Sequence, residues 1–540
     1  MAHEVVAGPV RPSNGPTGSE TRAERRRGPR RRQLPRMPFG VGTYLLVQAV
    51  LLFWWAARYP GLFSPDSLDH VWQATTGNWN THHPVAYTGL VWLSVQLTGG
   101  VGALTLAQGF GLAAGLTYAV TGLRRIGGPA WGWATAAVAV VLLPPVGTFV
   151  VCVWKDVPFV ICHVFLLGTL ARLVDRRRTT GGTAPPRGLL GALLVELTLV
   201  CLFRQNGFLV AVIVTGLVAV LVRGTALRVL LAGVLAATIA LLANWALLPA
   251  LGVRDSGSIV AYESFLADLA VGYDAGPQDF PAADTALMAT VAPLTHWRNS
   301  ANCYTVDPTV YSPDFDRQAA TTRRTELLAA WWRLVRRAPG TVLEARLCRA
   351  SVAWRPTPAG MLTGNPTAWA LPIYLERDPR FHAAEVRTVA FSQPVSERAA
   401  RLADTLTNRV SGPEWLLWRG ATWAYLAYLF VGLLAWQRRE RAVLVLAALS
   451  LGNQLSVMVV NNAQAARYMA APLVLGILLV PLLAAGPPRQ RSALADPHPD
   501  SGTDPTPPLQ VSNLTITPAS ATDAPPDDWF WSSERFGPGR

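Results

Sequence analysis

Long apolar runs alternate with short polar segments along most of the chain. Each run is long enough to cross about 30 Å of hydrocarbon, which takes roughly 20 residues as a helix, whereas β-barrel strands would be about ten residues of alternating polarity. The pattern therefore predicts an all-α polytopic membrane protein. We expect ten transmembrane helices, at residues 41–58, 103–122, 130–150, 157–173, 188–203, 207–222, 229–251, 414–436, 442–460 and 468–486.

The composition agrees with this pattern. Of the 540 residues, 51% are hydrophobic and only 15% are charged, which excludes a soluble multidomain protein. The formal net charge of +14 is also no sign of a nucleic-acid partner, because nine arginines lie in residues 1–40, directly before the first apolar run. Basic residues in that place mark the cytoplasmic side of a membrane protein. Residues 1–37 and 487–540 are poor in aliphatic residues, and we expect disordered cytoplasmic termini.

The positions of the arginine clusters predict the topology. Clusters at 124–125, 176–178 and 438–441 all fall in cytoplasmic loops if Val85–Leu97 is a helix on the outer membrane surface and does not cross. Residues 38–251 then form one transmembrane module and 414–486 the C-terminal transmembrane helices. The outer side receives the acidic first loop 59–84 and a mainly helical cap formed by 252–413.

The first outer loop contains a helix start with acidic residues behind it. Ser64 before Pro65 is typical of an N-cap followed by the first helical position. Asp66, Asp69 and Gln73 then share one helix face. Either aspartate is a candidate general base, and the sequence does not choose between them. The alternative is that Asp66 only complements the helix dipole, a stabilisation of about 0.3–1 kcal/mol.

Three cations occur at the predicted outer ends of spans. Lys155 is the only lysine among 47 basic residues, and Arg204 and Arg467 occupy similar positions. Charges at membrane depth usually face a cavity or a partner, so these three are candidates for binding a phosphate. The alternative is that their side chains reach the interface and form local ion pairs.

Several other polar residues share the predicted outer side. We expect contacts to substrate from Gln73, His83, Asp156, Asn206 and Tyr468. No histidine or cysteine spacing indicates zinc, and a divalent cation stays open as a cofactor. Cys303 and Cys348 are the only cysteines of the cap, where an oxidising exterior would permit a disulfide, but the sequence leaves their pairing open.

The order of these motifs resembles a known family. They are Asp66, His83-Pro84-Val85-Ala86-Tyr87, Trp154-Lys155-Asp156, Arg204-Gln205-Asn206-Gly207 and Arg467-Tyr468. In this order they resemble the GT-C superfamily of integral-membrane glycosyltransferases, best over 41–251 and less firmly over 414–486. The resemblance implies an inverting enzyme that uses a polyprenyl-phosphate sugar as donor, with Asp66 as base and the three cations at the lipid phosphate.

This resemblance favours mannose as the sugar and an extracytoplasmic acceptor, such as a cell-envelope glycan, a glycolipid, a secreted protein or an exported natural product. The partners would be the lipid bilayer, the lipid-linked donor and that acceptor. The arginine-rich composition fits the plasma membrane of a high-GC bacterium. The main alternative is a transporter or flippase of lipid-linked glycans, although the chain lacks the internal repeats typical of transporters. A non-catalytic relative that serves as a partner subunit is a third hypothesis.

Overall fold

The computed structural model describes Gly8 and residues 37–180, 185–222, 224–255, 259–357, 364–409 and 412–486. Within these ranges all regular structure is helical, and the only β-type pairings are isolated bridges. The predicted disordered termini, 1–37 and 487–540, fall outside the described residues apart from Gly8 and Met37.

Six helical segments are long and apolar enough to cross a membrane, which confirms an all-α polytopic membrane protein. A seventh crossing results if α5 and α6, which are bent by 70° at Leu143, count as one span. The six comprise α1 (Phe39–Ala57), α4 (Gly102–Ile126), α7 (Asp156–Thr180), α10 and its π-helical continuation (Ala226–Ala250), Arg441–Val459 with α25 (Ala448–Val459), and Ala466–Ala484 with α26 (Ala470–Leu479); the bent pair is α5 (Ala130–Leu142) and α6 (Pro144–Val150).

The other three predicted spans are helical but do not meet the same criterion of length and composition. They are α8 (Arg187–Phe203), α9 (Gly207–Leu221) and α24 (Gly420–Arg438). The predicted surface segment is α3 (Val85–Thr98), an apolar helix shorter than a full span. All the predicted apolar segments are therefore helices in this part of the chain, and the count of ten crossings stays a prediction.

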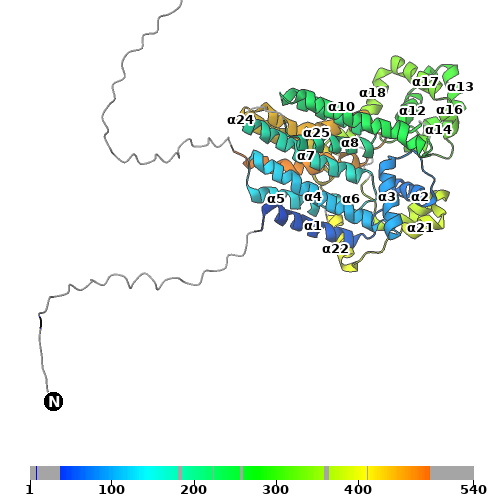
Figure 1. Ribbon diagram of the computed structural model, residues 1–540. Coiled ribbons are helices and arrows are strands. Elements are labelled where there is room, and N and C mark those ends of the chain that lie inside the picture. Colours follow the sequence, from blue (N-terminus) through cyan, green and yellow to red (C-terminus); the bar gives the residue numbers. More distant parts are fainter. Residues whose placement is uncertain are drawn as a thin grey trace, which may run out of the picture. The chain divides into compact units, whose positions relative to one another are not determined.

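Helices α4 and α7 lie side by side and approach closely (Figure 1). A Cβ atom on Gly122 would lie 2.9 Å from the carbonyl oxygen of Gly168, so the contact requires glycine there. Small residues at such contacts are typical of helix packing in membranes. Arg172 of α7 also contacts α4. Its guanidinium donates to the carbonyl of Tyr118 at 2.9 Å and lies over the Tyr118 ring, 3.7 Å from the ring centre.

The cap consists of short helices around a hydrophobic core of their own, which includes Leu266, Trp297 and Leu334. Figure 1 shows these helices, from α12 to α18, grouped together beside the ends of the long helices. A disulfide joins Cys303 to Cys348, with 5.6 Å between their Cα atoms, which settles the pairing that the sequence left open. The helices are α12 (Ile259–Ala275), α13 (Ala282–Ala289), α14 (Leu294–Asn299), α15 (Asp307–Val310), α16 (Arg317–Thr322), α17 (Arg324–Arg337), α18 (Pro339–Arg349) and α19 (Ser351–Trp354).

The rest of the outer region surrounds the first loop. Helix α2 (Pro65–Thr76) packs against α3 and α21. Helix α22 packs against α1, and Arg58 of α1's C-terminal end forms an ion pair with Asp404 of α22 at 2.5 Å. The remaining helices are α20 (Leu371–Arg377), α21 (Ala384–Val389), α22 (Glu397–Arg409) and α23 (Glu414–Leu417).

Two cap segments are attached to the chain that precedes α26. Thr305 forms an antiparallel bridge with Ala463, and the amide of Val306 donates to the carbonyl of Asn462 at 2.9 Å. The side chain of Gln464 donates to the carbonyl of Cys348 at 2.9 Å. The half-cystines thus belong to the two segments that hold residues 461–464 in place. These contacts position Arg467, which follows in the sequence.

Candidate functional site

Helix α2 begins as the sequence predicts. Ser64 is its N-cap and Pro65 its first residue. The Ser64 side chain accepts from the amide of Ser67, and the Ser67 hydroxyl accepts from the amide of Ser64, which completes a capping box. Asp66 lies in the first turn, where a carboxylate is favoured by the helix dipole.

A short backbone pairing fixes α2 against the segment that carries Lys155. The amide of Leu62 donates to the carbonyl of Val151 at 2.9 Å, and the amide of Val153 donates to the carbonyl of Leu62 at 3.0 Å. The indole of Trp154 donates to the Ser64 hydroxyl at 2.7 Å. These hydrogen bonds hold Asp66 next to Lys155, although the two residues are 89 positions apart in the sequence.

The structure brings together Asp66, Lys155, Arg467 and His83, which we call the Asp66 cluster. Oδ2 of Asp66 accepts from Nζ of Lys155 at 3.0 Å and from the guanidinium of Arg467 at 2.9 Å. Burial by itself raises the pKa of Asp66, but the charges of Arg467 and Lys155 outweigh it and hold that pKa well below its ordinary value. Asp66 is therefore ionised at neutral pH.

His83 connects the cluster to the second aspartate. Nζ of Lys155 lies 3.2 Å from Nδ1 of His83, and because an ammonium group only donates, Nδ1 is the acceptor. Burial, followed by the charge of Lys155, holds the pKa of His83 well below its ordinary value, so the ring is neutral and carries its proton on Nε2. Nε2 lies 4.0 Å from Oδ2 of Asp69.

Asp69 has both carboxylate oxygens engaged. Its Oδ2 accepts from the amide of Gln73 at 2.7 Å, and its Oδ1 accepts from Arg380 at 2.9 Å. The first bond confirms the predicted shared face of these two α2 residues. The Asp69 side chain is 5% exposed, against 25% for Asp66. Of the two candidate bases, Asp66 is thus the more accessible.

The other predicted site residues form a second group next to the first. Arg204 pairs with the buried carboxylate of Asp156 and donates from Nε to Asn206 at 2.9 Å. Asn206 in turn donates to the hydroxyl of Ser456 at 2.9 Å. The ring of Tyr468 lies between the two groups, with its centre 4.7 Å from the Arg204 guanidinium carbon and 5.4 Å from that of Arg467.

A small pocket of about 20 Å³ lies beside the Asp66 cluster. Arg467 lines it together with Asn365 and Trp418, and the remaining lining residues are apolar and belong mainly to α6 and α26. The pocket is therefore lined by one cation among mainly apolar side chains, and it has room for about one water molecule.

Sequence reasoning missed two residues near these acids. Arg380 of the cap binds Asp69 from a position 311 residues further along the chain, and no local pattern pointed to it. Asp307 is the second, since burial and then the charge of Asp66 raise its pKa. The sequence signal for Asp307 was weak, because the acid lies in a cap segment without periodicity.

Within the described ranges, no group of three or more His, Cys, Asp or Glu side chains is arranged to hold a metal ion. Comparison of the chain with models of protein families, with curated proteins and with solved structures finds no match.

Proposed function

We propose that the protein is an inverting membrane glycosyltransferase that moves a sugar from a polyprenyl-phosphate donor to an extracytoplasmic acceptor. The order of sequence motifs that resembles the GT-C superfamily supports this proposal, and mannose is the sugar that the resemblance favours. The bilayer, the lipid-linked donor and a glycan, lipid, protein or natural-product acceptor would be its partners. The proposal includes ten membrane crossings, with the cluster on the outer side of a bacterial plasma membrane.

The observation that carries the proposal is the way in which Asp66 is bound. Both cations contact Oδ2, and no described residue donates a hydrogen bond to Oδ1. The second oxygen can therefore accept a proton from an acceptor hydroxyl while the first remains fixed. A carboxylate that is ionised, oriented and partly open has the properties of a general base.

In the proposed reaction the acceptor hydroxyl attacks the anomeric carbon of the donor sugar. A new carbon–oxygen bond forms as the bond to the phosphate oxygen breaks, and the polyprenyl phosphate leaves with the electron pair. The hydroxyl proton passes to Oδ1 of Asp66. Attack from the face opposite the phosphate inverts the anomeric centre. Lys155 and Arg467 stabilise the negative charge that develops on the leaving phosphate.

This arrangement links donor binding to the strength of the base. In this proposal the donor phosphate binds the same two cations as Asp66, namely Lys155 and Arg467. The bound phosphate therefore competes with Asp66 for these cations and weakens their electrostatic effect on its carboxylate. The pKa of Asp66 then rises toward its ordinary value, and the carboxylate becomes a stronger base in the complex.

The test is sugar transfer by the full chain in nanodiscs. Radiolabelled sugars on polyprenyl phosphate are supplied as donors, and a membrane and secreted-product extract supplies acceptors. We expect transfer by the wild type and loss of turnover in Asp66→Asn, which keeps the shape but removes the base. Asp284→Asn is the matched control, because Asp284 is a buried acid that pairs with Arg333 in the cap.

One result would overturn the proposal. If no donor supports transfer by the wild type, while the protein in sealed liposomes moves lipid-linked sugars across the bilayer equally well with Asp66→Asn, the chain is a transporter. Donor binding to the variant, measured separately, shows whether the substitution has damaged the fold.

A further inference from the structure

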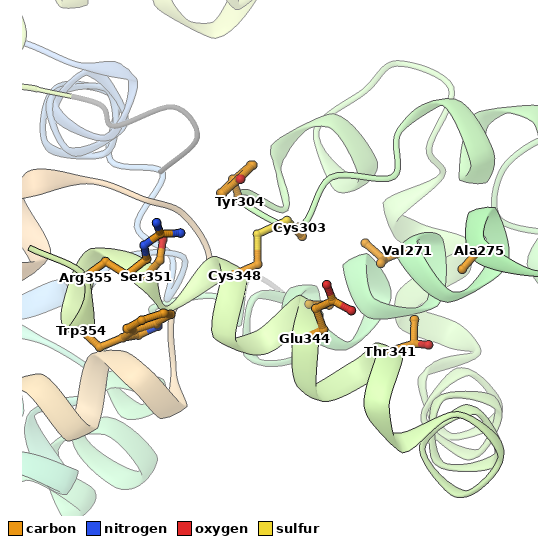
Figure 2. Close-up of a pocket in the computed structure, with 11 residues that line it drawn as sticks. Val271, Ala275, Cys303, Tyr304, Thr341, Glu344, Cys348, Ser351, Trp354 and Arg355 are labelled. Atoms are coloured by element: carbon orange, nitrogen blue, oxygen red, sulfur yellow. A yellow bond between two sulfur atoms is a disulfide. The ribbon is translucent and has the colours of Figure 1, made fainter. Parts of the chain in front are cut away.

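The cap contains a cavity of about 460 Å³, which lies within the range of about 300–1,000 Å³ typical of small-molecule sites. Its walls come from α12, α18, α19 and the segment at residues 303–304. Figure 2 shows the lining side chains arranged around the Cys303–Cys348 disulfide. The disulfide joins two of the walls, and so it fixes the separation of the segments that enclose the cavity.

The charged groups of the cavity are opposite in sign, and the guanidinium of Arg355 lies over the ring of Trp354, 5.7 Å from its centre. Glu344 lies on α18 and Arg355 follows α19, and neither forms an ion pair with any described residue. A carboxylate at one wall repels an anion, and a guanidinium at another repels a cation. The pair therefore favours a neutral ligand with several hydroxyl groups, which can donate to Glu344 and accept from Arg355.

The aromatic groups indicate the shape of that ligand. Tyr304 and Trp354 line the cavity, and the indole of Trp354 is fixed by a 3.0 Å hydrogen bond to the carbonyl of Leu347. Flat rings suit the apolar face of a sugar ring, and Thr341 adds a hydroxyl to the lining. A ligand with hydroxyls on its edge and carbon–hydrogen groups on its faces meets both requirements.

We propose that this cavity binds a neutral saccharide, and, as a deepening that rests on the proposed transferase function, that the saccharide is part of the acceptor. Tyr304 is three positions before Asp307, so their Cα atoms lie within about 11 Å. The carboxylate of Asp307 is close enough to Asp66 for the charge of Asp66 to contribute to its raised pKa. The segment that contributes Tyr304 to the cavity wall therefore also carries Asp307, an acid that the charge of Asp66 influences.

A second connection leads from the cavity to the Asp66 cluster. Cys303 and Cys348 line the cavity, and the adjoining residues hold the chain at 461–464 through the Thr305–Ala463 bridge and the bond from Gln464 to the Cys348 carbonyl. Arg467 follows three residues after Gln464 and binds Asp66 at 2.9 Å. The geometry points to an acceptor glycan that extends from the cap toward the cluster.

The test begins with binding. Trisaccharides of mannose, glucose and N-acetylglucosamine are titrated against the full chain in nanodiscs, with ligand-observed NMR as the readout. We expect at least one of them to bind and Glu344→Gln and Tyr304→Ala each to weaken that binding by about tenfold, the usual effect of losing a hydrogen bond to a charged group or an aromatic contact. Glu385→Gln, an exposed acid on α21 outside the cavity, is the matched control and leaves the affinity unchanged.

The two proposals can fail separately. Saccharide binding that depends on Glu344 and Tyr304, in a protein that transfers no sugar, supports the cavity as a saccharide site and overturns only its role in transfer. The reverse outcome is sugar transfer with an acceptor KM that is unchanged in both variants, and no saccharide binding that depends on the cavity. This result overturns the inference and leaves the proposed transferase function unaffected. Preferential binding of an anionic or peptide ligand at the same residues also overturns it.

Discussion

Asp66 and Arg467 lie 401 positions apart in the chain, yet the guanidinium of Arg467 donates to Oδ2 of Asp66 at 2.9 Å. Lys155 binds the same oxygen at 3.0 Å. One carboxylate oxygen thus holds two cations, while the other accepts no hydrogen bond from the residues that the structure describes. The predictions that concern catalysis depend on this asymmetry.

The first prediction separates the two aspartates of α2. Because both oxygens of Asp69 are engaged by Gln73 and Arg380, we expect Asp69→Asn to keep turnover within about tenfold of the wild type. Loss of a general base costs about 10²–10⁴ in rate, which we expect only for Asp66→Asn. Single-turnover transfer with saturating donor is the measurement. Equal losses in both variants, with donor affinity retained, would contradict the assignment of Asp66.

The second prediction concerns the pH dependence of transfer. Asp66 must be ionised, and its pKa in the free protein is held well below the ordinary value of about 3.9, so the acid limb of kcat/KM lies below pH 4. Lys155→Gln removes one of the two charges that lower this pKa. The acid limb should therefore move to higher pH, and the KM for the donor should increase.

The control for this prediction is Arg380→Gln, which changes a cation that binds Asp69 and not Asp66. Its acid limb should coincide with that of the wild type. An acid limb that is identical in Lys155→Gln and wild type would show that the carboxylate beside Lys155 is not the titrating base.

The third prediction concerns the stability of the cap. The disulfide closes a loop between residues 45 positions apart, and a loop of that length corresponds to about 4 kcal/mol of lost unfolded-state entropy. We expect the double variant Cys303→Ser, Cys348→Ser to lower the melting temperature of the full chain. Reductant should lower it in the wild type and have no effect on the variant. An equal response to reductant in both proteins would be the contrary result.

The fourth prediction concerns Glu263, a buried acid of α12 that contacts Tyr311 at 3.0 Å, Arg317 at 3.4 Å and Asn462 at 3.2 Å. Burial, only partly offset by Arg317, raises the pKa of Glu263 to about 7. A raised pKa means that the folded protein holds the proton of this carboxyl more tightly than the unfolded chain does. The resulting stabilisation is complete below about pH 4.3, the pKa in the unfolded chain, and it is lost as the pH rises to about 7.

We therefore expect the free energy of unfolding to fall by about 1–3 kcal/mol between pH 4.5 and 7 from this residue alone. Thermal melting across that range is the measurement. Glu263→Gln should remove this part of the pH dependence, and Glu385→Gln, an exposed acid on α21, should not. A steeper pH dependence in Glu263→Gln would contradict the sign.

The sequence predicted the local parts of the site and the common outer side of its residues, but not the long-range contacts between them. Ser64 and Pro65 start a helix because capping is decided by neighbouring residues, and Asp69 and Gln73 bond because helix geometry places them one turn apart. Lys155 and Arg467 were expected on the same outer side as Asp66, as candidates for binding a phosphate, but their contacts with Oδ2 of Asp66 were not predicted.

The cap was less predictable. Its helices are short, and its core arises from contacts between segments that share no hydrophobic periodicity. Neither the contact of Arg380 with Asp69 nor the cavity lined by Tyr304 could therefore be inferred from the sequence. The pairing of Cys303 with Cys348 was left open for the same reason, since connectivity depends on the three-dimensional arrangement. Apolar length also gave no sign of the bend at Leu143 within the predicted span 130–150.

The separation of Asp66 and Arg467 also has a consequence for biosynthesis. A ribosome that adds about 5–20 residues per second needs about 20–80 s to travel the 401 positions between them. During that interval α2 is complete while the second cation of its carboxylate has not been made. The two-cation site can thus form only after Arg467 has been synthesised, and chains that end before this residue retain Lys155 but lack the second cation.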